Sequence, residues 1–102
     1  MQIKFNDAYL EKLYQGKVKG KHRYSNDIVK RFRRVIDTIK NTANTHDLSK
    51  FVGLNFEALK GNKKGLFSVR VSKGYRIEFY IEKDEIKIAE IVVVQDLSNH
   101  YD

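Results

Sequence analysis

The spacing of apolar residues changes once along this chain, and that change constrains the fold more than any other feature. Between Ile28 and Ile39 apolar side chains recur every three or four residues, the period of a helix with one buried face. From Leu54 onward they recur every second residue, the period of a strand with one buried face. Because helix-forming residues precede strand-forming residues, the pattern predicts an α+β domain.

The first half of the chain carries cap and stop signals for a strand and two helices. Asn6 or Asp7 can cap the first helix, which Gly16 ends, and Ser25 can cap the second. The expected order is a strand over residues 2–5, a helix up to Gly16, an exposed basic loop over 17–24, a helix after Ser25, an irregular segment over 41–47 and a helical turn over 48–51.

Residues 67–71 and 75–81 alternate between apolar and polar side chains and predict a hairpin. A two-residue loop would pair Val71 with Arg76 and mix the two faces of the sheet. A three-residue loop over 72–74 instead pairs Val71 with Tyr75 and places Gly74 where a left-handed conformation is wanted. We therefore predict the three-residue loop.

Two further strands are expected beside the hairpin. One covers Phe56 to Lys60, with Leu59 in the core and Lys60 on the opposite, polar face. The other covers Ile86 to Val94, whose continuous apolar run suits a strand covered on both faces or interrupted by a bulge near Glu90. The predicted fold is thus a short N-terminal strand, two helices and a three- to four-stranded, mainly antiparallel sheet, forming one domain over residues 1–102.

The predicted register places Arg70 opposite Arg76 on the face away from the core. Like charges at that spacing destabilise a sheet by up to ~1 kcal/mol unless a carboxylate or a bound anion bridges them. Two interpretations follow from the sequence. Either the arginines are neutralised by Glu78, Glu57 or Glu90, or the pair binds an anion.

All of the excess positive charge lies in the first half of the chain. Residues 1–53 hold 12 Lys plus Arg and 5 Asp plus Glu, whereas residues 54–102 hold 8 of each. This distribution suits a nucleic acid, an acidic protein partner, or simply a solvated helix face. The basic residues that could hold RNA are Lys17, Lys19, Lys21, Arg23, Lys30, Arg31, Arg33 and Arg34, with Lys63 and Lys64 in the glycine-flanked turn 60–65.

Composition excludes several other classes of protein. The absence of cysteine rules out a disulfide scaffold, a thiolate metal site and a cysteine nucleophile. No two histidines stand at ligand spacing, so we expect no metal and no cofactor. The turn 60–65 lacks the Gly-Lys-Ser/Thr ending of a nucleotide-binding loop. No apolar run suggests a membrane span or a signal peptide, so we expect a soluble, cytoplasmic protein.

The last residues place a histidine and a tyrosine side by side. His100 and Tyr101 could serve proton transfer, since one imidazole and one phenol lie together. A frayed end or a simple packing contact is the alternative.

Residues 59–71 and 74–79 resemble the HigB toxins of the RelE/ParE superfamily, and the ending 96–101 is similar to that of HigB-like proteins. This resemblance implies a type II toxin–antitoxin module whose toxin enters the ribosomal A site and cleaves mRNA. It also implies a helix-turn-helix, HigA-like antitoxin as partner, with DNA contacted only through the antitoxin, and no membrane.

The resemblance further implies roles for individual residues. Arg76, in the Tyr-Arg-Ile segment, would stabilise charge on the phosphate, with support from Arg70. Lys60, in the Leu-Lys-Gly segment, would contact the scissile phosphate. His100 and Tyr101 would serve proton transfer and base stacking, and either Glu57 or His100 would be the base.

Two other functions stay open at this point. In the ParE branch of the superfamily the toxin inhibits DNA gyrase as a protein ligand, and such a protein would not need His100. The basic first half would also suit a plain nucleic-acid-binding module, with salt-sensitive binding and no growth arrest on expression.

Overall fold

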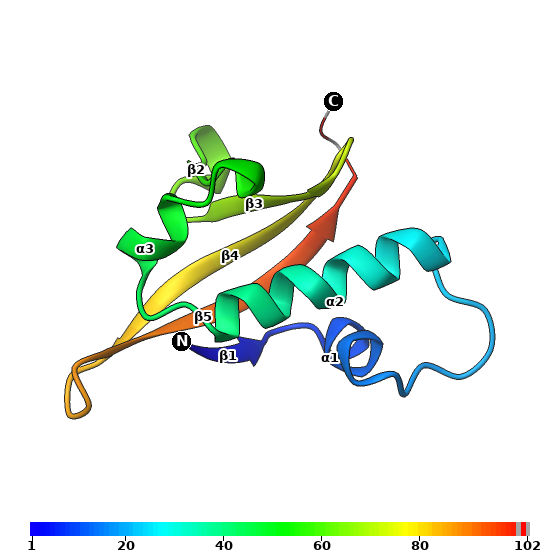
Figure 1. Cartoon of the computed structure of the whole chain (residues 1–102), viewed down its shortest axis with the longest axis horizontal. Coiled ribbons are helices and arrows are strands. Elements are labelled where there is room, and N and C mark those ends of the chain that lie inside the picture. Colours follow the sequence, from blue (N-terminus) through cyan, green and yellow to red (C-terminus); the bar gives the residue numbers. More distant parts are fainter. Residues whose placement is uncertain (100, 102) are drawn as a thin grey trace.

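The computed structural model describes residues 1–99 and Tyr101, whose strands form one mixed five-stranded sheet (Figure 1). The two remaining residues, His100 and Asp102, lie outside the described part. The strand order is β1-β5-β4-β3-β2, and only the β1–β5 pair is parallel. The strands are β1 (Gln2–Phe5), β2 (Glu57–Ala58), β3 (Phe67–Ser72), β4 (Tyr75–Asp84) and β5 (Ala89–Ser98). The predicted α+β class with an N-terminal strand is confirmed.

The helices begin at side chains that accept a hydrogen bond from the first turn. Asp7 caps α1 (Ala8–Gln15), and the left-handed Gly16 ends it. Ser25 Oγ accepts from the Ile28 N–H at 3.2 Å at the start of α2 (Asn26–Lys40). A third helix, α3 (Thr45–Ser49), begins earlier than the predicted turn because Asn44 caps it. No helix in the described residues is long and apolar enough to cross a membrane.

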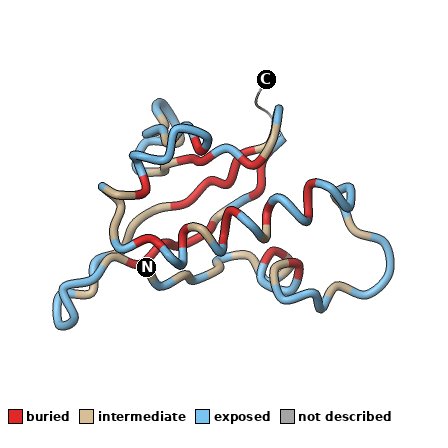
Figure 2. Tube along the Cα trace, viewed as in Figure 1, coloured by how far each residue is buried: buried red, intermediate tan, exposed pale blue. Residues whose placement is uncertain are grey.

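The core lies between α2 and one face of the sheet (Figure 2). Phe32, Ile36 and Ile39 of α2 are fully buried, as are Ile77 and Phe79 of β4. Burying each such side chain stabilises the fold by about 1.5–3 kcal/mol. Helix α2 therefore covers one face of the sheet, and the residues that alternate with the core residues point to the other face.

The β3–β4 hairpin keeps the predicted register through a different turn. Phe67 pairs with Phe79 and Arg70 with Arg76, as expected. However, Ser72 pairs with Tyr75, so the loop has two residues and the three-residue loop is wrong. The register shifts between Arg70 and Ser72, as in a β-bulge, which adds one residue to β3. With this extra residue, a two-residue loop still keeps the apolar side chains of both strands on the same face of the sheet.

The last strand differs from its predicted bounds of Ile86 to Val94. Ile86 and Ile88 lie in the β4–β5 turn and are 95% and 92% exposed, because the Asp84 side chain accepts backbone N–H groups there and closes the turn. Strand β5 starts after them. Its register shifts at Gln95, between the pairs Phe79–Val94 and Glu78–Asp96, and not near Glu90.

The segment before β3 also differs from expectation. Strand β2 covers only two residues, and Leu59 is half-buried outside the core. Phe56 packs there instead, stacked on Phe67 with ring centroids 5.3 Å apart. Lys60 is exposed and begins a 3₁₀ turn over Gly61–Lys63, so it does not project from the polar face of a strand.

Candidate functional site

The sheet face opposite α2 brings together polar residues from four strands. The register aligns Glu57, Ser68, Glu78 and Asp96 in one row across β2, β3, β4 and β5. The next row contains Arg70, Arg76 and Ser98. The site predicted around the two opposed arginines is therefore a real juxtaposition, with a row of acidic and hydroxyl side chains beside it.

Arg76 is a buried cation whose hydrogen-bond partners among residues 1–99 and 101 are all neutral oxygen atoms. The residue is 7% exposed, and its Nε donates to Ser68 Oγ at 2.8 Å. Its Nη2 donates to the backbone oxygens of Ser68, at 3.3 Å, and Asn55. Asn55 has a positive φ of 43°, which Asn tolerates, at the end of a 3₁₀ turn over Val52–Leu54. These contacts fix the guanidinium plane, and none of them brings a negative charge to it.

None of the three carboxylates proposed from sequence neutralises the arginines. Neither Arg70 nor Arg76 forms an ion pair with any residue in the described part of the chain. Glu78 pairs with Lys63, and Glu90 accepts from the backbone and side chain of Thr45 at 2.8 and 2.6 Å. Glu78 and Glu90 have other partners, and Glu57 forms no ion pair with a described residue, so the described part of the chain does not support the neutralisation interpretation, and the anion-binding interpretation is left.

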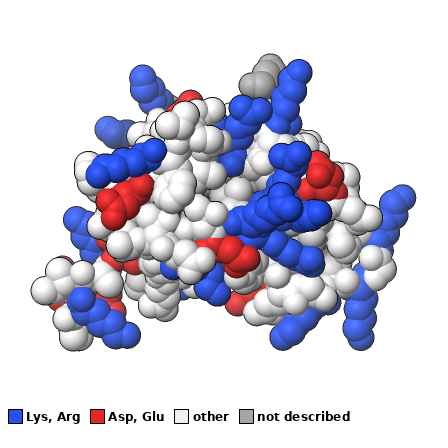
Figure 3. All heavy atoms as spheres, in the orientation of Figure 1, with Lys and Arg blue, Asp and Glu red and all other residues white. Residues whose placement is uncertain are grey.

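A cleft of about 270 Å³ opens beside the two arginines. Its cations are Arg70, Lys73 and Arg76, and no described carboxylate lines it. A neighbouring cleft of about 530 Å³ shares Arg70 and Lys73 and reaches Arg31 on α2, together with Asp27, the ion-pair partner of Arg31. Figure 3 shows blue side chains gathered from the region of the β3–β4 turn across to α2. This arrangement creates a positive field suited to a phosphate chain.

Tyr101 closes one side of the smaller cleft. Its backbone N–H donates to the Gly74 oxygen at 3.3 Å, and Arg76 Cζ lies 5.5 Å from its ring centroid. Its hydroxyl donates to Glu78 Oε2 at 2.5 Å. Burial and this hydrogen bond raise the pKa of Tyr101 to about 12. Tyr101 is thus anchored to the sheet, and the frayed-end interpretation is wrong for it.

The predicted catalytic residues are only partly brought together. Arg70, Arg76 and Tyr101 line one cleft. Glu57 is exposed on the neighbouring row, close enough that its charge contributes to the raised pKa of Tyr101. Lys60 is exposed, and its side chain forms no hydrogen bond or ion pair with another described residue. The predicted role of His100 falls outside the described residues.

The predicted RNA-binding residues divide into engaged and available cations. Arg33 Nε donates to the Leu13 oxygen at 3.0 Å, Arg31 pairs with Asp27 at 3.0 Å, and Arg23 stacks over the Tyr9 ring. Lys63 is engaged by Glu78. Exposed side chains without a partner among the described residues are Lys17, Lys19, Lys21, Lys30, Arg34 and Lys64.

Sequence reasoning missed four residues that shape the site. Ser68 and Asn55 orient Arg76, Glu78 holds Tyr101, and Lys73 adds a cation to the cleft. The predicted register had already placed Ser68 opposite Glu78, so the sequence did indicate that these two side chains lie on the same face of the sheet. Nothing local in the sequence indicates that a backbone oxygen of residue 55 reaches Arg76.

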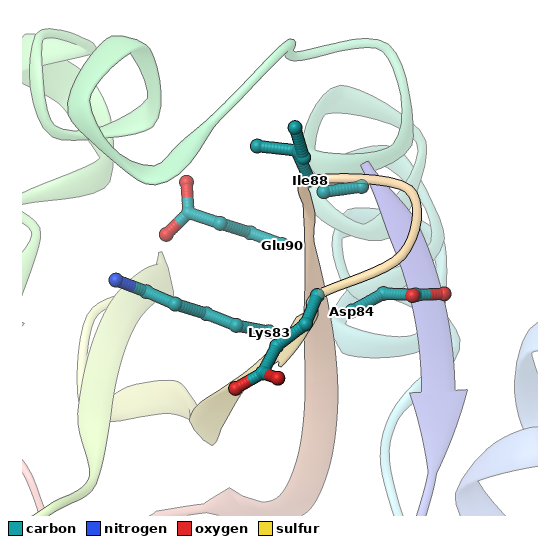
Figure 4. A pocket seen from close by; sticks show the side chains of 6 residues that line it. Lys83, Asp84, Ile88 and Glu90 are labelled. Carbon is teal, nitrogen blue, oxygen red and sulfur yellow. The ribbon is translucent and has the colours of Figure 1, made fainter.

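A separate cleft lies at the far end of the β4–β5 hairpin (Figure 4). Lys83 and Glu90 extend to the same side there, beside Asp84 and Ile88. Its volume is about 510 Å³, yet none of the predicted site residues lines it. No group of three His, Asp or Glu residues that could hold a metal ion occurs within residues 1–99 and 101. The arginine cleft is therefore the candidate site.

Comparison with known proteins agrees with this fold. Residues 3–93 match the family described as the RelE-like toxin of the type II toxin-antitoxin system HigB. The match covers most of the chain, so this protein is a type II toxin and belongs to the HigB-like family of the RelE/ParE superfamily. No curated protein matches the chain.

Solved structures with a similar fold include toxins alone and in complexes. A YoeB/ParE toxin from Agrobacterium tumefaciens has a TM-score of 0.62 at 20% identity, covering 99% of this chain and all of that one. A YoeB-YefM complex from Staphylococcus aureus gives 0.59 at 18%, and a heterotetrameric YoeB-YefM toxin-antitoxin complex from the same organism gives 0.57 at 20%. Each of the latter two covers 99% of this chain and 98% of its own. These likenesses concern the fold alone.

Proposed function

We propose that this toxin is a ribosome-dependent endoribonuclease that cleaves translated mRNA without a metal ion and so inhibits translation. The observation that carries the proposal is Arg76, a buried guanidinium oriented by neutral oxygens at the edge of a cleft that no described carboxylate lines. A preorganised cation stabilises charge that develops on a phosphate more than a solvated cation can.

The reaction uses the ribose 2′-hydroxyl as nucleophile. A base takes the 2′-proton while the 2′-oxygen attacks the adjacent phosphorus, and the bond from phosphorus to the 5′-oxygen breaks as an acid protonates that oxygen. The products are a 2′,3′-cyclic phosphate and a free 5′-hydroxyl. The protein must position the strand, neutralise the phosphate and move two protons.

We assign the roles that the family resemblance implies to these residues. Arg76 contacts the scissile phosphate, and Arg70 supports it from the opposite strand. Lys60, which is exposed and uncommitted, reaches the same phosphate from the 60–65 turn. Glu57 or His100 acts as base.

Tyr101 serves as a stacking surface rather than as a proton carrier. Its pKa of about 12 keeps the phenol neutral near pH 7, and its proton is already donated to Glu78. Its ring at the cleft edge can stack on a base of single-stranded mRNA, which is how proteins commonly read RNA.

A type II toxin–antitoxin module implies two partners for the toxin, namely the ribosome with its mRNA and an antitoxin. The exposed cations of α2 and the 17–24 loop hold ribosomal RNA backbone while the cleft takes mRNA in the A site. An antitoxin of the helix-turn-helix, HigA-like type, which the resemblance implies, blocks the toxin; the YoeB-YefM toxin-antitoxin complex supports an antitoxin partner without indicating its type. The whole chain acts as one domain in the cytoplasm, where translation occurs.

Induced expression tests the proposal directly. We compare wild type with Arg70→Ala, Arg76→Ala and His100→Ala, and map 5′ ends of cellular mRNA. We expect growth arrest with new 5′ ends inside translated frames, lost in all three variants. Arg70 is exposed, so Arg70→Ala separates chemistry from folding. Lys87→Ala, at the distant β4–β5 turn, is the matched control and should cleave as wild type does.

Other outcomes identify the alternatives. Growth arrest with intact mRNA would instead support inhibition of DNA gyrase. Salt-sensitive binding of bare RNA or DNA without growth arrest would leave a plain nucleic-acid-binding module.

A further inference from the structure

Glu78 is a carboxylate held almost entirely out of water on the site face of β4. Its side chain is 4% exposed, and both of its partners come from distant segments. Lys63 Nζ donates to Oε2 at 2.8 Å, and the Tyr101 hydroxyl donates to the same oxygen at 2.5 Å. Burying a charge costs free energy even when it is paired, so stability alone is a weak explanation for a buried ion pair.

The chain contains an internal comparison for this arrangement. Glu82, four residues along the same strand, also pairs with a lysine, Lys4 at 3.3 Å, and accepts from a tyrosine, Tyr80 at 3.5 Å. Its side chain is 42% exposed, and it does not line the cationic cleft. What distinguishes Glu78 is therefore its burial and the position of its tyrosine.

Three contacts locate Tyr101, and only one of them fixes the tip of its ring. The backbone bond to Gly74 holds the chain, and the contact with Arg76 involves the ring face. The hydroxyl bond to Glu78 holds the far end of the side chain and so sets its rotation. Lys63 in turn ties the 60–65 turn, which carries Lys60, to the same carboxylate.

We propose that Glu78 is a positioning residue, which holds the Tyr101 ring at the cleft edge as a preformed stacking surface for a base of the mRNA and tethers the 60–65 turn through Lys63. This inference rests on the proposed nuclease function. A ring fixed before binding loses less conformational freedom when the base arrives, which favours productive binding. Glu78 itself does not touch the substrate.

Cleavage of mRNA in a purified translation system tests this role. The variants are Glu78→Leu, which removes the acceptor, Glu78→Gln, which keeps an acceptor and the shape, Tyr101→Phe, and the double variant Glu78→Leu/Tyr101→Phe. We expect kcat/KM to fall about tenfold in Glu78→Leu and Tyr101→Phe, and less in Glu78→Gln. Both changes break the Tyr101–Glu78 contact, and Glu78→Leu also frees Lys63, so the double variant should lose little more than Glu78→Leu alone. Glu82→Leu is the matched control and should cleave as wild type does.

A spectroscopic readout separates positioning from folding. In protein labelled with ¹³C at tyrosine Cζ, the resonance absent from Tyr101→Phe belongs to Tyr101. We expect this resonance to move at pH 7 in Glu78→Gln and Glu78→Leu and to stay in place in the Glu82 control, with thermal unfolding confirming that each variant is folded.

The outcomes distinguish the two proposals. A wild-type protein that leaves mRNA intact would overturn the nuclease, and the role of Glu78 on mRNA with it. An active wild type whose folded Glu78 variants cleave equally well, or lose activity multiplicatively with Tyr101→Phe, would overturn the role of Glu78 alone.

Discussion

A Cβ atom on Gly74 would lie 2.9 Å from the backbone oxygen of Tyr101, closer than real Cβ contacts allow. The same glycine has a φ of +81°, which side chains rarely adopt. Gly74 thus adopts the backbone conformation of the turn between β3 and β4. Because it has no side chain, it also leaves room for Tyr101, which closes the cleft. The tail of the chain and the hairpin turn are fitted to each other at this point.

Gly74→Ala should therefore damage the cleft more than it destabilises the fold. We expect the positive φ to cost about 1 kcal/mol in the free energy of unfolding and the displaced Tyr101 to lower mRNA cleavage further, about tenfold. Gly20→Ala is the control, because its φ of +76° gives similar strain and nothing lies within 4 Å of its Cβ position. Equal loss of cleavage in both variants would show that the contact with Tyr101 is unimportant.

Ser68→Ala should release Arg76 from its oriented position. The change removes the Nε acceptor at 2.8 Å and leaves a buried donor unpaired, so we expect a loss of about 1–3 kcal/mol in the free energy of unfolding. Cleavage should fall by at least tenfold, as measured at a temperature where the variant is folded. Ser49→Ala removes an exposed hydroxyl bond to the His46 oxygen and should leave both quantities near wild type. Full activity in Ser68→Ala would refute the orienting role.

Glu90 should make stability depend on pH. The two hydrogen bonds from Thr45 lower the pKa of the Glu90 carboxyl below its ordinary 4.5. A lowered pKa in the folded state adds stability above 4.5, and this stability is lost as the pH falls through the lower folded value. The difference in urea midpoint between wild type and Glu90→Gln should thus be larger at pH 7 than at pH 3. Glu85→Gln, at an exposed position on the same hairpin, is the control and should show no such difference. If the difference in urea midpoint between wild type and Glu90→Gln were the same at pH 7 and pH 3, the stabilising role of the ionised Glu90 would be contradicted.

The exposed cations of α2 should contribute to the salt dependence of RNA binding. Lys30 and Arg34 have no partner among the described residues, so each is available for a phosphate. For a single-stranded RNA, replacing both by Ala should reduce the slope of log K against log salt by about 1.4, or ~0.7 per lost contact. The charge-matched double variant Lys83→Ala/Lys87→Ala at the β4–β5 hairpin should keep the wild-type slope. Identical slopes in both would mean that α2 presents only a solvated face.

Much of the fold was predictable because its signals are local. The period of α2, the caps at Asp7 and Ser25 and the pairing of Arg70 with Arg76 depend on residues close in sequence or on the parity of one hairpin. The errors lie where a single residue changes the pairing. One register shift lies before Ser72 and another at Gln95. Each adds a residue to one strand, and the spacing of apolar residues alone did not predict the loop length or the bulge position that results.

The candidate site was predictable only as a set of residue types. Sequence reasoning named Arg70, Arg76 and Tyr101, yet the only partners that it considered for the arginines were carboxylates and a bound anion. The actual partners of Arg76 are a serine on the neighbouring strand and a backbone oxygen of Asn55. A backbone oxygen has no signature in the sequence, so such a partner emerges only once the chain is folded.

The sequence by itself determined the order of helices and strands, the buried face of each and the alignment of the two arginines, because hydrophobic period and parity act over a few residues. Only the tertiary structure decided that Arg76 is buried without an ion pair to any described residue, that Glu78 is engaged by Lys63 and Tyr101, and that Tyr101 contacts Gly74. Burial and hydrogen bonding depend on which distant segments cover a position, and that is a property of the whole packed chain.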